Sequence, residues 1–328
     1  MTTELDTLPE PLALQPQMMS LDIGLPGIVL QAGPAARFAW DEFFAGTLRN
    51  PHTRKAYARA VTHFLSWLES GSVPLVRVTP GMVGAYLDLL PVAAPSKKLA
   101  LAAIRRFFDA MTLRHAVALN PAASVRGERY EVVEGKTPEA TPAQARTLLA
   151  SIDTTAPAGL RDRAVIATLI YTAARAGAVA RLKQRDFVAD GTQHVLRFAE
   201  KGGKQREIPV RHDLDAYLLD YLTASGAYEF PSLPLFRSTV GRTGRFTARP
   251  MTGTDIWRMV KRRLTDAGLP GNLSPHSFRV ATVTDLLAQG VPLGEVQYLA
   301  GHADPRTTRL YDRRQKKVTR NLVERISI

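Results

Sequence analysis

Apolar side chains recur every three or four residues between positions 37 and 127, which is the spacing of amphipathic helices. The segment 53–70 opens with Thr53, a residue type that caps helix starts, and a second helix is expected from Thr79-Pro80. A third segment, 96–115, places Leu99, Ala103 and Phe107 on one helical face. The pattern predicts a small helical bundle over residues 37–127.

A second domain is expected over residues 141–328, after a linker at 128–140 that lacks periodicity. It opens with Thr141-Pro142-Ala143-Gln144, which has the form of a capping box with proline in the first turn. The segments 194–200 and 205–210 flank a Gly-Gly pair and predict a β-hairpin. Helices are expected at 211–225, 252–267 and 275–289, so the chain is predicted to be mainly α with a small β-sheet.

Residues 1–36 differ from both domains. Prolines recur there without helical periodicity, and the apolar stretch 28–30 is too short to form a core. This pattern predicts a flexible N-terminal arm, which is either disordered or docked on a neighbouring molecule.

Composition excludes several classes of protein. The 328 residues suffice for two domains, and no apolar run of about 18 residues predicts a membrane span. The absence of cysteine excludes disulfides, thiolate nucleophiles and cysteine-based zinc sites. No basic residue precedes Arg37, so neither a secretory signal nor a transit peptide is expected, and a cytoplasmic location is predicted.

Charge supplies the first positive indication of function. The chain carries a net charge of +13, and because the first 36 residues hold four acids and no base, the other 292 residues carry +17. A globular body this basic favours a polyanion, most often nucleic acid. Basic residues on the predicted helix 96–115, at Lys97, Lys98, Arg105 and Arg106, would suit a DNA-facing surface or simply a solvated one. An anionic membrane is less favoured, because the bases form no single amphipathic helix.

Six residues of the second domain are candidates for chemistry, and each alone is a weak signal. Arg175 follows an apolar helix, Lys201 lies at the tip of the predicted hairpin, and Tyr311 lies on a short C-terminal helix. His276 and Arg279 are three residues apart on one helix face, and His302 follows a glycine. Taken singly, the lysine is a typical turn residue and the tyrosine a typical packing residue.

In this order, the six residues resemble the tyrosine recombinase (phage integrase) family. The family has a T-G-L-R-like box, a hairpin reading G-K-G-x-K-x-R-x-V-P, then H-x-x-R, G-H and a nucleophilic tyrosine. Here these motifs read TAAR, EKGGKQREIPV, HSFR, GH and Tyr311. The resemblance covers about residues 37–328, in an Xer-like two-domain layout that leaves only the arm outside.

The resemblance implies a SAM-like core-binding domain at 37–127 and a mixed α/β catalytic domain at 141–328. Two departures from the family pattern are Ala178, where an acid is common, and Val280, where a polar residue is usual. Lys204 is the alternative to Lys201, and Arg181 is a distant alternative to Arg175.

The chemistry of these residue types fits the implied roles. A tyrosine hydroxyl with a pKa near 10 is a poor nucleophile, so attack on a phosphodiester needs cations that stabilise charge on the phosphate oxygens. Arg175 and Arg279 suit this task because guanidinium groups bind phosphate bidentately. His276 and His302 can donate hydrogen bonds or accept the tyrosine proton, and Lys201 can protonate the departing 5′ oxygen. No metal or other cofactor is implied.

The resemblance therefore implies a site-specific DNA recombinase that works through a 3′-phosphotyrosyl intermediate and a Holliday junction. Its expected partners are a double-stranded DNA recombination site and three further copies in a homo-tetramer, or a tetramer shared with a related recombinase. The C-terminal residues Leu322, Val323, Ile326 and Ile328 either pack on the next protomer or fold back on their own domain. The alternatives are a type IB topoisomerase-like enzyme and a catalytically idle DNA-binding protein.

Overall fold

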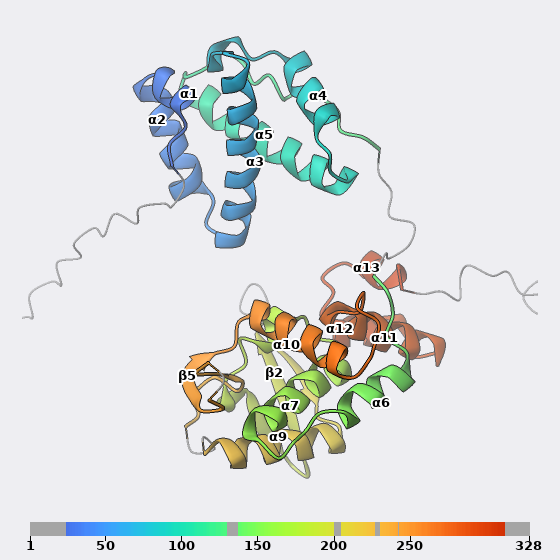
Figure 1. Cartoon of the computed structure of the whole chain (residues 1–328). Helices are drawn as coiled ribbons and strands as arrows, with labels where there is room; N and C mark the ends of the chain where they lie inside the picture. Colours follow the sequence, from blue (N-terminus) through green and yellow to red (C-terminus); the bar gives the residue numbers. More distant parts are fainter. Residues whose placement is uncertain (1–23, 130–136, 200–204, 227–229, 242, 312–328) are drawn as a thin grey trace, which may run out of the picture. The chain divides into compact units, whose positions relative to one another are not determined.

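The computed structural model describes residues 24–129, 137–199, 205–226, 230–241 and 243–311. The chain divides into two compact units, residues 1–131 and 132–328 (Figure 1), and the division falls within the predicted linker. Among the described residues, no helix is long and apolar enough to cross a membrane.

The first unit is built from helices alone in its described part. They are α1 (Gly27–Gln31), α2 (Pro34–Asp41), the π-helical turn η1 (Glu42–Thr47), α3 (Pro51–Ser70), the 3₁₀ turn η2 (Leu75–Arg77), α4 (Pro80–Leu89) and α5 (Ala94–Leu113). The helices α3 and α5 pack against each other (Figure 1). Buried aromatic side chains fill the core, among them Phe43, Phe64 and Phe107.

Three details of this unit differ from the sequence predictions. The flexible arm was predicted to extend to residue 36, but Ile28 and Val29 of α1 are buried in the helical core, so the first unit includes these residues. Helix α3 starts at Pro51 instead of Thr53, since the Asn50 side chain accepts hydrogen bonds from the first free backbone N–H groups. On α5, Ala103 is buried as predicted, but Leu99 is 44% exposed.

Some bases expected on an outer face have internal partners. Lys97 forms an ion pair of 2.9 Å with Glu128. Arg105 donates from Nε to the carbonyl of Ala122 at 3.0 Å and from Nη2 to the carbonyl of Val125. Arg105 therefore holds the segment after α5 in place, which is a structural use of a residue expected to face solvent or DNA.

The second unit combines helices with two small sheets. Its helical elements are α6 (Pro142–Ala150), α7 (Pro157–Thr172), α8 (Ala176–Val179), η3 (Gln184–Asp186), α9 (His212–Ser225), α10 (Gly253–Asp266), α11 (Pro275–Ala288), α12 (Leu293–Ala300) and α13 (Pro305–Arg309). Its strands are β1 (Phe187–Asp190), β2 (Gln193–Ala199), β3 (Gln205–Pro209), β4 (Arg237–Thr239) and β5 (Phe246–Pro250). The fold is mainly helical with small sheets, as predicted.

The predicted hairpin is part of a larger sheet. Strands β2 and β3 pair antiparallel, and β1 adds to the other edge of β2 in the order β1-β2-β3. A separate pair, β4-β5, was not predicted. The capping box at the start of α6 forms as expected, with Thr141 and Gln144 exchanging hydrogen bonds of 2.9 and 3.1 Å.

Helix α7 is the central element of this unit. Its neighbours include α9 and α11, and ten of its residues are buried. Because α7 is buried, its C-terminal end is held firmly, and the chain leaves it toward α8 through Ala173 and Ala174, which are buried as well. The end of α7 is the place from which the candidate site is built.

Candidate active site

Arg175 is positioned by an abrupt end of α7. Ala173 closes the helix with φ of 50°, the left-handed region that favours glycine, where the family motif has Gly. The backbone turns there, and Arg175 becomes the N-cap residue of the short helix α8 with an exposed side chain. A buried helix end thus presents an arginine at the surface.

Arg279 lies directly behind this turn. It is only 1% exposed on α11, and its Nη1 donates to the carbonyl of Ala173. Its Nε and Nη2 are buried without a hydrogen-bond partner among the described residues. Burial first, then the charge of Arg175, lowers its pKa to about 10, while the Tyr311 side chain acts in the opposite direction. Nε and Nη2 of Arg279 are therefore buried donors whose hydrogen bonds are not used among the described residues.

His302 and Tyr311 lie side by side at the other end of the cluster. Helix α12 ends at Gly301 in a left-handed conformation, and His302 follows with 5% exposure. Its Nδ1 is 2.9 Å from Thr308 Oγ1, and its ring stacks on that of Tyr311 with centroids 5.8 Å apart. Tyr311 is half-buried just after α13, where its N–H donates to the Thr308 carbonyl at 3.0 Å.

Both histidines favour the neutral form. Burial is the largest cause that lowers the pKa of His302 to about 4. The neighbours that add to this effect are, in order, Arg279, Arg175, His276 and Arg206. His276 lies at the exposed side of the cluster, and desolvation of its ring, then Arg279 and Arg175, lowers its pKa as well. A neutral imidazole has one donor and one acceptor nitrogen, so each ring can donate one hydrogen bond and offer one lone pair to a proton donor.

Arg206 belongs to this cluster and was not assigned a role from the sequence. It lies on β3, where it is 5% exposed, and donates from Nη1 to the carbonyl of Leu299 on α12. Its guanidinium lies 4.9 Å from the ring centroid of Phe198. The available signal was the alternation of β3, which turns Arg206 and Ile208 inward together.

The lysine of the set lies outside the described residues, and so does its alternative, Lys204. The last described pair before the connection is Ala199 with Gln205. Arg181, the alternative to Arg175, is exposed. The charge of Arg175 lowers the pKa values of His276, Arg279 and His302, whereas Arg181 is not among the charges that do so. Of the two departures from the family pattern, Ala178 packs against the hydrophobic core and Val280 is buried.

The structure thus brings together five of the six predicted residues: Arg175, His276, Arg279, His302 and Tyr311. Three arginines surround two neutral histidines and a phenol, with Arg206 as the third cation. Such a cluster stabilises an anion that develops charge beside the tyrosine, and a phosphodiester oxygen fits the guanidinium donors.

Family models match both units. The model described as the phage integrase family matches residues 139–317, and the model of the phage integrase N-terminal SAM-like domain matches residues 41–115. The chain is 30% identical over 274 residues to tyrosine recombinase XerD of Ralstonia nicotianae, covering 81% of this chain and 84% of that protein. It is 30% identical over 276 residues to tyrosine recombinase XerC of Methylobacterium sp., covering 80% and 83%.

Solved structures share the fold. A XerH site-specific recombinase in a post-cleavage complex with palindromic difH substrate superimposes with a TM-score of 0.67 at 19% identity, covering 88% of this chain and 84% of that one. A lambda integrase tetramer bound to a Holliday junction gives a TM-score of 0.61 at 17% identity, covering 84% and 75%.

Proposed function

The chain belongs to the phage integrase family as a tyrosine-type site-specific recombinase, and from this premise we propose that it cleaves and rejoins DNA through a 3′-phosphotyrosyl intermediate. The observation that carries the proposal is the pair of buried Arg279 donors without an internal partner, set beside Tyr311 and Arg175. Arg175 and Arg279 bind the non-bridging oxygens of the scissile phosphate.

In the cleavage step, the Tyr311 hydroxyl oxygen forms a bond to phosphorus while the bond from phosphorus to the 5′ oxygen breaks. The phenol proton passes to one of the two neutral imidazoles, His276 or His302, and Lys201 supplies a proton to the departing 5′ oxygen. The phosphodiester is conserved as a phosphotyrosine, so attack by a 5′-hydroxyl reverses the step without an external energy source.

Strand exchange requires two DNA sites, and we propose that four copies assemble on them and pass through a Holliday junction. The second unit offers a place for a partner segment: a pocket of about 1010 Å³ between α6, α7, α9 and α11, with apolar lining from Leu149, Ile170 and Ala281. The C-terminal residues 312–328 follow Tyr311 directly and lie outside the described residues. We propose that the apolar residues of this C-terminal segment bind in the pocket of the next protomer. Each protomer would then be joined to its neighbour by the segment that follows its own nucleophile, which closes a ring. Because the substrate is DNA, we propose a cytoplasmic location.

The test is covalent trapping on DNA selected from fragments that flank the gene. A nick beside the scissile phosphate releases a short 5′-hydroxyl fragment and prevents religation, so the phosphotyrosyl adduct accumulates and resists SDS. We expect the adduct with the native protein and none with Tyr311→Phe. Tyr298→Phe is the matched control, since Tyr298 is an exposed tyrosine on α12, and we expect this variant to form the adduct as the native protein does.

Each outcome of this test is informative. Tight DNA binding without an adduct would overturn strand cleavage and favour an idle DNA-binding protein. An adduct with supercoil relaxation but no exchanged strands would overturn recombination and favour a topoisomerase-like activity.

A further inference from the structure

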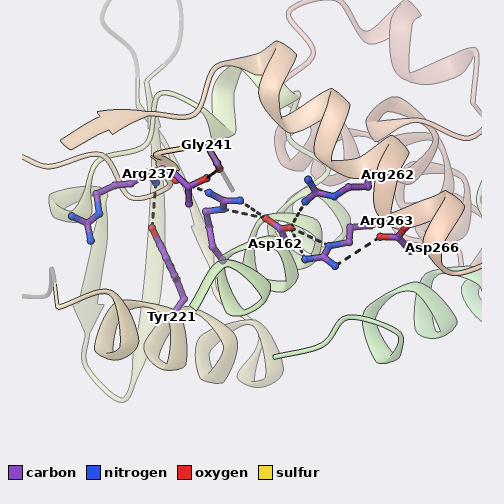
Figure 2. A network of polar contacts seen from close by, with 9 residues as sticks. Asp162, Tyr221, Arg237, Gly241, Arg262, Arg263 and Asp266 are labelled. Atoms are coloured by element: carbon purple, nitrogen blue, oxygen red, sulfur yellow. Dashed lines mark hydrogen bonds and ion pairs between the residues drawn. The ribbon is translucent and has the colours of Figure 1, made fainter. Parts of the chain in front are cut away.

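Asp162 on α7 is a fully buried carboxylate that holds three arginines (Figure 2). Arg161 donates to its Oδ1 from Nε and Nη2 at 3.1 and 2.7 Å, and Arg263 donates to its Oδ2 from Nε and Nη2 at 3.0 and 2.8 Å. Arg262 adds one bond from Nη2 to Oδ2 at 2.9 Å. A carboxylate has about four lone-pair sites, so two arginines already occupy them and Arg262 is the fifth donor.

The three arginines differ in what else they do. Arg161 also donates from Nη1 to the carbonyl of Arg237 at 3.0 Å, which joins α7 to β4. The Arg263 side chain is 19% exposed and lies 3.9 Å from Asp266. The Arg262 side chain is 58% exposed, and among the described residues Asp162 is its one hydrogen-bond partner. Arg161 and Arg263 therefore hold elements together, whereas Arg262 keeps most of its donors at the surface.

The charges of this network do not cancel. Two carboxylates, Asp162 and Asp266, face three guanidinium groups, so the group carries a net charge of +1. A buried carboxylate fixes the guanidinium groups that it binds, which lowers the entropy lost when one of them takes a further ligand. Arg262 is thus a preorganised, exposed cation whose only anionic partner among the described residues, Asp162, is shared with two further arginines.

The exposed face of α10 around Arg262 is basic. The Lys261 ammonium is used within the protein, where it donates to the carbonyls of Gly271 and Leu273. Arg258, one turn before Arg262, is exposed. Asp255, by contrast, is occupied at the start of the helix, where it accepts hydrogen bonds from Thr252. A helix face with this composition fits a polyanion.

Helix α10 begins beside the candidate active site. Gly253, the first residue of α10, packs so closely on α8 that an added Cβ would lie 3.4 Å from the backbone of Gly177. Arg175 is the N-cap residue of the same short helix. At 1.5 Å per residue, Arg262 lies roughly 13 Å along α10 from Gly253. Arg262 therefore lies on the helix that starts beside the element carrying Arg175, about half a turn around the helix axis from Gly253.

We propose that Arg262 binds a backbone phosphate of the DNA substrate away from the scissile one, and that Asp162 holds its guanidinium in the orientation for binding. The inference rests on the proposed function, because it takes the same DNA duplex as the ligand. Arg262 is a DNA-binding residue, and Asp162 acts through it as a positioning residue.

The test measures how the DNA affinity of the full-length protein depends on salt, by fluorescence anisotropy on the selected fragment. Each phosphate contact adds about 0.9 to the slope of log K against log salt concentration. We expect Arg262→Gln to weaken binding roughly tenfold at low salt and to reduce the slope by about 1, with the melting temperature changed by less than about 2 °C. Arg262→Lys keeps the charge and is expected to restore the slope.

Arg263→Gln is the matched control, because Arg263 is adjacent in sequence and binds the same carboxylate oxygen. It is expected to lower the melting temperature and leave the salt slope unchanged; if it fails to fold, Arg263→Lys takes its place. An unchanged slope in Arg262→Gln, or equal slope changes in both variants, would overturn the proposal. If that happens while the native protein still forms the Tyr311 adduct, the proposed function stands and only the phosphate site is lost. A native protein without DNA affinity would overturn both.

Discussion

The imidazole ring of His302 lies nearly parallel to the phenol ring of Tyr311, with centroids 5.8 Å apart and planes inclined by 10°. Thr308, which lies between them in sequence, hydrogen-bonds His302 through its side chain and Tyr311 through its carbonyl. The contact means that the geometry of the proposed nucleophile and the protonation state of the histidine depend on each other. A proton on His302 would add a cation to a cluster that already contains three arginines.

The first prediction concerns acid stability. Because the pKa of His302 is lowered from 6.5 to about 4, the unfolded chain binds this proton more tightly, and acid favours unfolding. The stability due to neutral His302 is fully present above pH 6.5 and is lost as the pH falls toward 4. We expect the His302 contribution to lower the free energy of unfolding by about 2 kcal/mol between pH 7 and pH 5, as measured by urea denaturation at each pH.

The His302→Asn variant isolates this contribution from the other titrating groups. Its free energy of unfolding should change less between pH 7 and pH 5 than that of the native protein. His212→Asn, which removes an exposed histidine of the same unit, serves as the control and should follow the native curve. Parallel curves for His302→Asn and the native protein would contradict the prediction.

The second prediction separates charge from geometry in the phosphate clamp. Arg279→Lys keeps a cation but cannot present two fixed donors in addition to the one that serves the Ala173 carbonyl. We expect the rate of adduct formation on the nicked DNA to fall by a factor on the order of 100 or more at saturating protein. Arg181→Lys, an exposed arginine close in sequence to Arg175, should change this rate less than about twofold. Equal rates for Arg279→Lys and the native protein would remove Arg279 from the clamp.

The third prediction tests Arg206 as a positioning residue. Its guanidinium contributes to the lowered pKa of His302 and joins β3 to α12 through the Leu299 carbonyl. In Arg206→Met, the loss of a nearby cation should raise the pKa of His302 above about 4, as followed by NMR titration of labelled histidines, and adduct formation should slow. Arg197→Met, on the neighbouring strand and paired with Glu207 at 2.7 Å on the surface, is the control. A His302 titration identical to that of the native protein would exclude Arg206 from the site.

Elements with local signals were predictable from the sequence. The capping box of α6 needs only Thr141 and Gln144, and the start of α4 needs only Thr79 and Pro80. The short helix α1 has no such signal. It is stabilised by distant residues, as when the N–H of Ile28 donates to Glu69 Oε1 at 2.7 Å, so its burial could not be read from residues 24–36 alone.

The same distinction applies to the candidate site. The ordered residues from Arg175 to Tyr311 were identified through resemblance, because their types and spacing are specific to a family. Arg206 joins the cluster through a contact 93 residues away in sequence, and Asp162 meets Arg262 and Arg263 across about a hundred residues. Charge pairing over such separations depends on how α7, α10 and α12 pack, and no local pattern encodes it.

The last prediction concerns the helix that supports Arg175. Gly159 lies in the first turn of α7, where an added Cβ would lie 1.8 Å from the carbonyl oxygen of Asp153, a backbone atom that cannot move aside cheaply. We expect Gly159→Ala to lower the free energy of unfolding by about 2 to 4 kcal/mol, measured by urea denaturation, although alanine usually stabilises a helix. Gly84→Ala is the matched control on α4, because nothing lies within 4 Å of its added Cβ, and it should stabilise the protein by about 0.5 to 1 kcal/mol. If both variants gained stability, the inference that the loop at Asp153 packs closely on α7 would be contradicted. The inference that this packing holds α7 rigidly where it positions Arg175 would then fail as well.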